Sequence, residues 1–347
     1  MTVEYTRPLD RLSRSDEPGF GGKSANLGEL LAAEIPVPPG FAIATAAYEA
    51  FVRDTGLRGT IHDALAGAAG GDVDAVAAAS RTIGDAMRAA SVPDGVREEV
   101  DERYAQLGDG APVAVRSSAV GEDSAEATFA GQQETYLWVR DADRVCDALR
   151  DCWISLYSPP AITYRARLGE AKVLPAMGVT VQLMVDAEVS GVMFTCNPVS
   201  GDPSMVAINA SWGLGLAVVG GEVTPDDFLV SKVTGEVVRE HVHSKHVEYV
   251  PDPSGGGAVR VDVPPDRADR ACLDRSALAQ LIEVGKRVER HFAGHQDIEW
   301  AMARGDGELF VVQARPVTGL PTKPEKPKPA SAMSLIMSAF GAGPPKD

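Results

Sequence analysis

An acid, an amide and a guanidinium are spaced near the end of this chain in a way that suits a metal-bound triphosphate. Glu299 precedes a short loop, and Gln313 and Arg315 follow it. If these segments form a hairpin with its turn near Asp306, Glu299 lies directly opposite Gln313, and the two-residue strand period puts Arg315 on the same face. Carboxylate and amide oxygens are ligands for Mg²⁺, and the planar guanidinium matches phosphate.

The other face of this hairpin is apolar, which predicts that it packs on a core. The residues of this predicted core stripe are Ile298, Trp300, Phe310 and Val312. The plainer interpretation is an antiparallel pair whose polar residues simply face solvent. Other parts of the chain weigh against that alternative.

The composition is that of an ordinary globular protein, and its charge excludes some partners. The 347 residues are 44% hydrophobic and carry a net charge of -16, which would repel nucleic acid and anionic membranes. Apolar runs all fall short of the roughly 20 residues of a membrane span, and residues 1–14 lack the apolar core of a signal peptide. We therefore expect a cytosolic protein with reduced cysteines, in which an anionic nucleotide needs a local basic cluster and a metal ion.

Two segments of the N-terminal half offer such basic groups. The glycine loop 19–24 leads into a helical pattern, so its backbone N–H groups could cradle phosphate while Lys23 adds a charge. The loop is not a Walker A motif, because Glu17 stands where that motif has glycine. A β-branched strand at 112–118 places Arg116 near its end, where a ligand could reach it.

The pattern of elements predicts two lobes and a tail. We place the first lobe at 1–178, the second at 179–320, and a Pro/Lys-rich linker with a further segment at 321–347. Within these lobes the expected elements are helices between 60 and 106, a strand at 131–139, a helix at 143–157, a strand at 179–185 that opens the second lobe, a strand or hairpin within 232–250 and a helix at 275–292.

The tail contains a small apolar island after the linker. Met333, Ile336, Met337 and Phe340 recur at helical spacing, which is typical of a helix that docks on a partner. The alternative is a frayed tail that keeps a few apolar residues.

Five segments together resemble a known family. They read GFGGKSANLGEL, VAVRSSAVGEDSAEATFAGQQETYL, SGVMFTCNP, SWGLG followed by VVGGEVTPD, and QDIEWA followed by VVQARPVT, and they span residues 19–318 in family order. The chain resembles the N-terminal nucleotide-binding domain, of ATP-grasp type, of phosphoenolpyruvate synthase, pyruvate phosphate dikinase and rifampin phosphotransferase. This resemblance implies a two-lobed α/β ATP-grasp fold with mixed or antiparallel sheets and flanking helices.

The resemblance also implies roles in an Mg²⁺·ATP site. Lys23 and Arg116 would contact the ATP phosphates, and Arg315 would neutralise the charge of the terminal phosphate. These three residues are the candidate catalytic groups, because positioned cations are the main means of accelerating phosphoryl transfer. Glu299 and Gln313 would hold Mg²⁺.

Other positions of the family complete the nucleotide site. The loop through Gly131 would close over the phosphates, Thr135 would position the nucleotide, and Gln182 would lie at the adenine. The chain departs from the family at Asn209 and Leu216, where related segments carry glutamate. An acidic contribution from that loop is therefore in doubt.

In relatives of this type a histidine on a mobile domain, in a glycine-rich segment with a Ser-His pair, receives the phosphoryl group. None of the six histidines here has that setting: His62, His241, His243, His246, His291 and His295. We therefore expect the ATP-binding subunit of a split, AMP-forming phosphotransferase that acts on a histidine of a separate partner chain. The acceptor, bound mainly by the partner, would be an aromatic hydroxyl as in phenylphosphate synthase. Alternatives are a subunit of a pyruvate-phosphorylating enzyme like phosphoenolpyruvate synthase, or a regulatory module that binds ATP without catalysis.

Other groups suggest weaker functional hypotheses. His241 and His243 could form a metal pair by strand spacing, but a third ligand is missing from the pattern. Asp226 and Asp227 are interpreted as residues that cap or solvate a turn. Ser117 has no glycine elbow or ordered histidine to support acyl chemistry.

Overall fold

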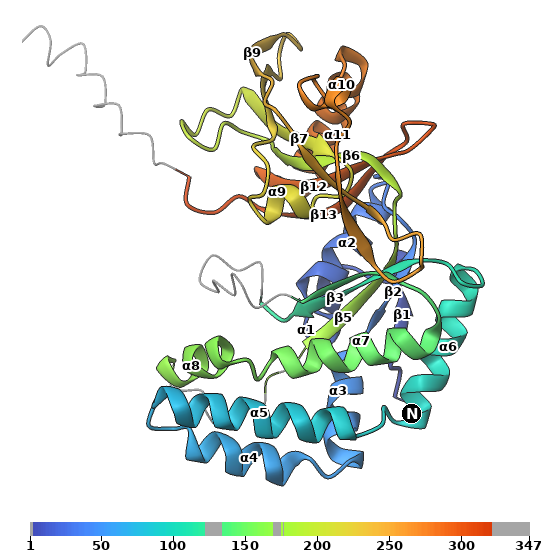
Figure 1. Ribbon diagram of the computed structural model, residues 1–347, viewed down its shortest axis with the longest axis vertical. Coiled ribbons are helices and arrows are strands. Elements are labelled where there is room, and N and C mark those ends of the chain that lie inside the picture. Colours follow the sequence, from blue (N-terminus) through green and yellow to red (C-terminus); the bar gives the residue numbers. More distant parts are fainter. Residues whose placement is uncertain (1–2, 122–133, 169–174, 176, 321–347) are drawn as a thin grey trace, which may run out of the picture.

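The computed structural model describes residues 3–121, 134–168, 175 and 177–320, and they form two lobes, each built on an antiparallel sheet (Figure 1). This architecture confirms the α/β class and the two-lobed arrangement expected from the sequence. Within the described residues, the structure contains no helix with the length and apolar character needed to cross a membrane.

The first sheet has five strands, and helices cover the face away from the second lobe (Figure 1). In sheet order the strands are β1 (Thr6–Pro8), β2 (Gly40–Ile43), β5 (Met177–Leu183), β3 (Val113–Ala119) and β4 (Thr135–Val139). The helices are α3 (Thr45–Asp54), α4 (Arg58–Gly67), α5 (Val73–Ala89), α6 (Asp94–Leu107), α7 (Ala142–Ser155) and α8 (Pro159–Arg167). The helices expected between 60 and 106 and the helix expected at 143–157 agree with these bounds.

The second sheet has six strands, with a long helix packed on its core face. In sheet order the strands are β13 (Leu309–Pro316), β12 (Gln296–Ala303), β6 (Ala187–Phe194), β7 (Met205–Trp212), β8 (Asp226–Ser231) and β9 (Val237–His241). The helix α11 (Arg275–Phe292) has the predicted bounds, and the remaining elements are α9 (Leu216–Val219), α10 (Pro265–Ala268) and the separate pair β10 (Val247–Pro251) and β11 (Ala258–Asp262).

Two strands lie in other places than the sequence suggested. Strand β5, expected to open the second lobe, lies between β2 and β3 in the first sheet, and the chain crosses to the second sheet between Leu183 and Ala187. Strands β9 and β10, expected as one strand or hairpin, pair with β8 and β11 instead. Pairing between strands that are distant in sequence leaves no local signal, which is why the sequence identified strands but not their partners.

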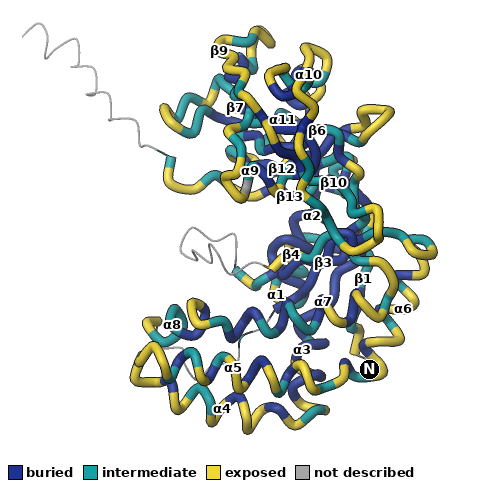
Figure 2. Tube along the Cα trace, viewed as in Figure 1, coloured by how far each residue is buried: buried dark blue, intermediate teal, exposed yellow. Residues whose placement is uncertain are grey.

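The N-terminal segment connects the two lobes. After β1 its elements are η1 (Leu9–Arg11), η2 (Arg14–Asp16), α1 (Glu17–Phe20) and α2 (Gly22–Ala32). Helix α2 lies between the lobes and is buried along most of its length (Figure 2). Gly28 allows this position, because a Cβ atom there would lie 2.3 Å from the backbone oxygen of Leu12. Leu27 and Leu30 belong to the hydrophobic core of the second lobe although they precede it by more than 150 residues.

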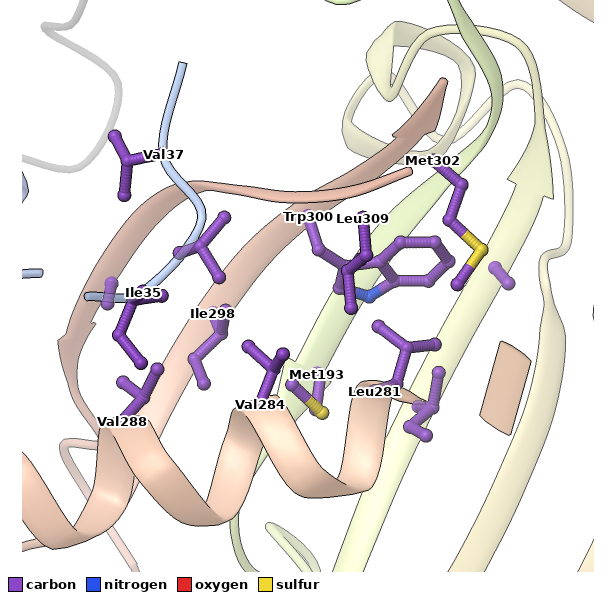
Figure 3. Packing of buried hydrophobic residues seen from close by; sticks show 14 of the residues in the cluster. Ile35, Val37, Met193, Leu281, Val284, Val288, Ile298, Trp300, Met302 and Leu309 are labelled. Atoms are coloured by element: carbon purple, nitrogen blue, oxygen red, sulfur yellow. The ribbon is translucent and has the colours of Figure 1, made fainter. Parts of the chain in front are cut away.

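That core lies between α11 and the sheet. Leu281, Val284 and Val288 on α11 face Ile298 and Trp300 on β12 (Figure 3). Ile35 and Val37 from the N-terminal segment pack at the edge of the same cluster (Figure 3). The core therefore fixes the orientation of β12 and β13, whose opposite face carries the candidate site.

A β-bulge in this hairpin changes the predicted core stripe. Near the turn, Trp300 pairs with Val311, and the register shifts between Trp300 and Glu299. On the turn side of the bulge the buried residues of β13 are therefore Leu309 and Val311, whereas Phe310 and Val312, predicted to be in the core, are only half-buried. The prediction was wrong for these two residues because a one-residue slip in register moves a side chain to the other face.

Candidate functional site

The hairpin carries its acid, amide and guanidinium on one face, as the sequence predicted. Glu299 pairs with Gln313, and Arg315 pairs with Asp297 one step further along the same face. The shift at the bulge restores the pairing that a simple turn at Asp306 would give. The polar face of the hairpin points toward the first lobe and away from α11.

Arg116 reaches this face from the first lobe. Its Nη2 atom donates to Oε2 of Glu299 at 3.1 Å and to Oε1 of Gln313 at 2.5 Å. Its Nη1 atom donates to the backbone oxygen of Val312 at 2.9 Å, which is the residue that the bulge adds to β13. We call these four groups the Arg116 cluster. Arg116 lies within β3 rather than at its end, so the sheet holds its backbone on both sides.

Lys23 lies in the first turn of α2 and is buried. Its Nζ atom donates to the backbone oxygen of Ser117 at 2.8 Å, and Ser117 follows Arg116 on β3. Gly21, the residue before α2, has a φ of 80°, and a Cβ atom there would lie 2.0 Å from the backbone oxygen of Ser118. The glycine loop therefore packs directly on β3, which places Lys23 beside Ser117, the residue that follows Arg116.

Thr135 and Gln182 lie on the strands that flank β3. Thr135 begins β4 and pairs with Arg116, so the two side chains share a face of the sheet. Gln182 on β5 is buried, and its Nε2 atom donates to the backbone oxygen of Pro38 at 3.3 Å. Gly131, expected in a loop over the phosphates, lies outside the described residues.

Asp297 is a second carboxylate that the sequence analysis did not select. Its Oδ2 atom accepts a hydrogen bond of 2.8 Å from Nε of Arg315, and its side chain is only 12% exposed. Burial raises the pKa of Asp297, and the neighbouring Arg315 opposes that rise. The signal was present in the sequence, because Asp297 and Glu299 are two residues apart on one strand and therefore share a face.

One of the two departures from the family, Asn209, lies near this face. Asn209 on β7 pairs with Val192, which in turn pairs with Glu299. Asn209 is therefore about 10 Å from Glu299 by strand spacing, in the same row of side chains. Leu216 begins α9 and is exposed. An amide thus occupies a place in the row where a carboxylate would add negative charge.

The oxygens on the hairpin fit a magnesium ion that is shared with a nucleotide. Mg²⁺ commonly keeps several waters and uses one or two protein carboxylates together with substrate phosphates. Glu299 supplies a carboxylate and Gln313 an amide oxygen at adjoining positions. Among the described residues, no three His, Cys, Asp or Glu side chains form a metal-binding group, which leaves the His241–His243 pair without support.

Comparison with known families and proteins supports a nucleotide site. The family described as "Pyruvate phosphate dikinase, AMP/ATP-binding domain" matches residues 17–334. The chain is 39% identical, over 99% of its length, to 29% of a probable phosphoenolpyruvate synthase from Methanocaldococcus jannaschii. It is 36% identical, also over 99% of its length, to 48% of the phosphoenolpyruvate synthase from Pyrococcus furiosus. The chain therefore spans half or less of the length of these two relatives.

A solved structure also resembles the chain, at a low level. It is the ADP complex of N5-carboxyaminoimidazole ribonucleotide synthetase, which is 13% identical with a TM-score of 0.30 and covers 64% of this chain and 38% of that chain. At this score the likeness carries no argument about function.

Proposed function

The chain belongs to the family of the pyruvate phosphate dikinase AMP/ATP-binding domain, and from this premise we propose that it binds Mg²⁺·ATP and donates a phosphoryl group to a histidine outside these 347 residues. The observation that carries the proposal is the meeting of Arg116 with Glu299 and Gln313 across the two lobes, beside Arg315. Two arginines beside a carboxylate and an amide favour phosphoryl transfer over nucleotide binding alone, because the transfer reaction depends on positioned cations.

Each group has a role that follows from its chemistry. Glu299 and Gln313 would hold Mg²⁺, which supplies Lewis-acid stabilisation of the phosphate oxygens when it is bound. Arg116, Arg315 and Lys23 would stabilise the negative charge on the transferred group, because this reaction depends on positioned cations. Thr135 would position the nucleotide beside Arg116, and Gln182 would contact the adenine.

Three histidines of this chain make structural contacts, which favours a histidine elsewhere as the acceptor of the phosphoryl group. The Nδ1 atom of His295 lies 2.6 Å from Oε1 of Glu289, and Nε2 of His291 lies 3.0 Å from Oε2 of Glu29. His243 contacts the backbone oxygen of Pro225 through its ring. These contacts give the three rings structural partners, so we propose that a partner chain carries the histidine and binds most of the final acceptor.

Two acceptor classes remain as candidates. The names of the relatives favour pyruvate, which would make the complete system similar to a phosphoenolpyruvate synthase. An aromatic hydroxyl is the second candidate and rests on the split arrangement that we propose. A regulatory ATP-binding module is the non-catalytic alternative, and it predicts no ATP turnover with any histidine-bearing partner.

Transfer of label from ATP tests the proposed function. ATP labelled in its β-phosphorus should place acid-labile label on a histidine-bearing partner domain, with formation of AMP, and the same domain with that histidine changed to alanine is the control. We expect no label on this chain in the absence of that partner. Acid-labile label on this chain alone would contradict the proposal, as would the absence of AMP when both parts are present.

Removal of the carboxylate charge tests the metal role. Glu299→Gln should weaken Mg²⁺·ATP binding by at least tenfold in calorimetry, because even loss of a partner of a metal ligand typically costs roughly 10- to 100-fold in metal affinity. Glu308→Gln is the matched control, since Glu308 is an exposed carboxylate near the turn of the same hairpin. Equal affinities of the two variants and the unchanged protein would assign Glu299 a structural role instead.

A further inference from the structure

One guanidinium nitrogen in the Arg116 cluster contacts both oxygens that we assign to the metal. Nη2 of Arg116 lies 3.1 Å from Oε2 of Glu299 and 2.5 Å from Oε1 of Gln313. These two oxygens come from opposed residues on neighbouring strands, so a cation between them can bind both. The nitrogen thus occupies the position that a divalent ion shared by these oxygens would need.

A metal ion and the guanidinium cannot both bind these two oxygens at the same time. Mg²⁺ binds oxygen at roughly 2.0–2.1 Å, so an ion on the same two atoms would lie very close to Nη2 of Arg116. Two positive charges at that distance repel strongly in a partly buried site. One of them must leave when the other binds.

The burial of Arg116 determines where it can go. Its side chain is only 11% exposed, whereas that of Glu299 is 37% exposed. A buried charge that loses its partner is strongly destabilising, so Arg116 needs a second anion when it leaves Glu299. The phosphates of a nucleotide would provide that anion, since a guanidinium binds phosphate as well as carboxylate.

We propose that Arg116 competes with the divalent metal for Glu299 and Gln313, and that the nucleotide resolves the competition by taking the guanidinium. This inference rests on the proposed function and adds a mechanism by which metal and nucleotide bind together. A metal ion that binds alone must displace Arg116 and leave the guanidinium without a counter-charge. ATP that binds without metal leaves the carboxylate of Glu299 facing the negatively charged phosphates. The metal ion and ATP therefore each raise the affinity of the protein for the other, beyond the effect of forming the metal–ATP complex in solution.

The bulge gives the cluster its fixed geometry. The added residue, Val312, presents its backbone oxygen to Nη1 of Arg116, and the same register shift places Gln313 opposite Glu299. The guanidinium is therefore held by three acceptors from one hairpin. A backbone oxygen cannot be replaced by a side-chain substitution, so the test must change Arg116.

Titration of Mn²⁺ without nucleotide tests the competition directly. The amount of free Mn²⁺, followed by its EPR signal, should show that Arg116→Gln binds the metal on the order of tenfold more tightly than the unchanged chain, because the competing guanidinium has been removed. A gain in affinity is the informative result, since a misfolded variant would lose affinity. Circular dichroism of each variant confirms that it is folded.

A charge-matched variant separates competition from general electrostatics. Lys23→Gln also removes one positive charge, from the first turn of α2, where the Nζ atom of Lys23 donates to the backbone oxygen of Ser117. It should therefore raise Mn²⁺ affinity clearly less than Arg116→Gln. Equal gains in the two variants, or no gain in Arg116→Gln, would overturn the proposal.

The result is independent of phosphoryl transfer. A gain in Mn²⁺ affinity without any transfer to a partner would support the competition and reject only the proposed function. Normal transfer without that gain would reject only the competition. The two ideas can therefore fail separately.

Discussion

Arg315→Ala is expected to lower the rate of AMP formation by on the order of 10³-fold, as for other arginines that stabilise a phosphoryl-transfer transition state. The side chain of Arg315 is 52% exposed at the end of the polar face of β13, where its Nε atom donates to Asp297. Asp297 is only 12% exposed and loses its ion-pair partner in this variant, so some loss of folding stability is expected as well. Turnover with a histidine-bearing partner should therefore be measured at a temperature at which thermal unfolding shows the variant to be folded.

The hairpin itself supplies the control for this experiment. Arg304 lies at the turn of the same hairpin and is 40% exposed, near Asp186. Arg304→Ala removes the same kind of side chain far from Glu299 and should leave turnover within about twofold. A folded Arg315→Ala variant with near-normal turnover would remove the role that we assign to Arg315.

Breaking the buried ion pair between Lys245 and Asp226 should cause the largest loss of stability. Both side chains are fully buried, and Nζ of Lys245 lies 2.5 Å from Oδ1 of Asp226. The same carboxylate accepts hydrogen bonds from the backbone nitrogens of His243 and Cys272. Lys245→Met should lower the free energy of unfolding by about 3–5 kcal/mol, because it leaves a buried carboxylate without its counter-charge.

Urea denaturation measures this loss, and a surface pair provides the comparison. Arg275 and Glu240 form an ion pair with exposures of 70% and 36%, so Arg275→Met should change the free energy of unfolding by less than about 1 kcal/mol. If Lys245→Met lowered the free energy of unfolding no more than Arg275→Met, the buried pair would not be a main source of stability. Mg²⁺·ATP affinity of the folded fraction should be unchanged, since neither residue lies in the Arg116 cluster.

The candidate hairpin could be predicted from the sequence because its two strands are adjacent in the chain. The turn residues and the alternation of side chains gave the pairing of Glu299 with Gln313, which the structure contains. The bulge could not be predicted, because residues 309–312 are all apolar and either register buries two of them. The alternation of these four residues therefore carries no information about which pair faces the core.

Contacts between residues that are distant in the chain could not be predicted from local sequence patterns. Arg116 was identified as a phosphate ligand from the resemblance, but its bonds to residues 183 and 197 positions later have no local signature. Asp226 was interpreted as a turn residue, whereas the structure buries it completely against Lys245. A short polar pair reads the same whether it faces water or a buried partner, so only the tertiary structure distinguishes the two.

The central position of β5 in the first sheet also determines when the protein can finish folding. Strands β2 and β3 have no direct pairing, so the sheet remains in two pieces until Met177–Leu183 has left the ribosome. Helix α2 completes its contacts later still, because its Asn26 donates to the backbone oxygen of Ala314, 288 residues away. Such distant contacts slow folding, since the loops between them must close first. The nucleotide site is therefore among the last parts of the molecule to assemble, and a nucleotide stabilises only the completed chain.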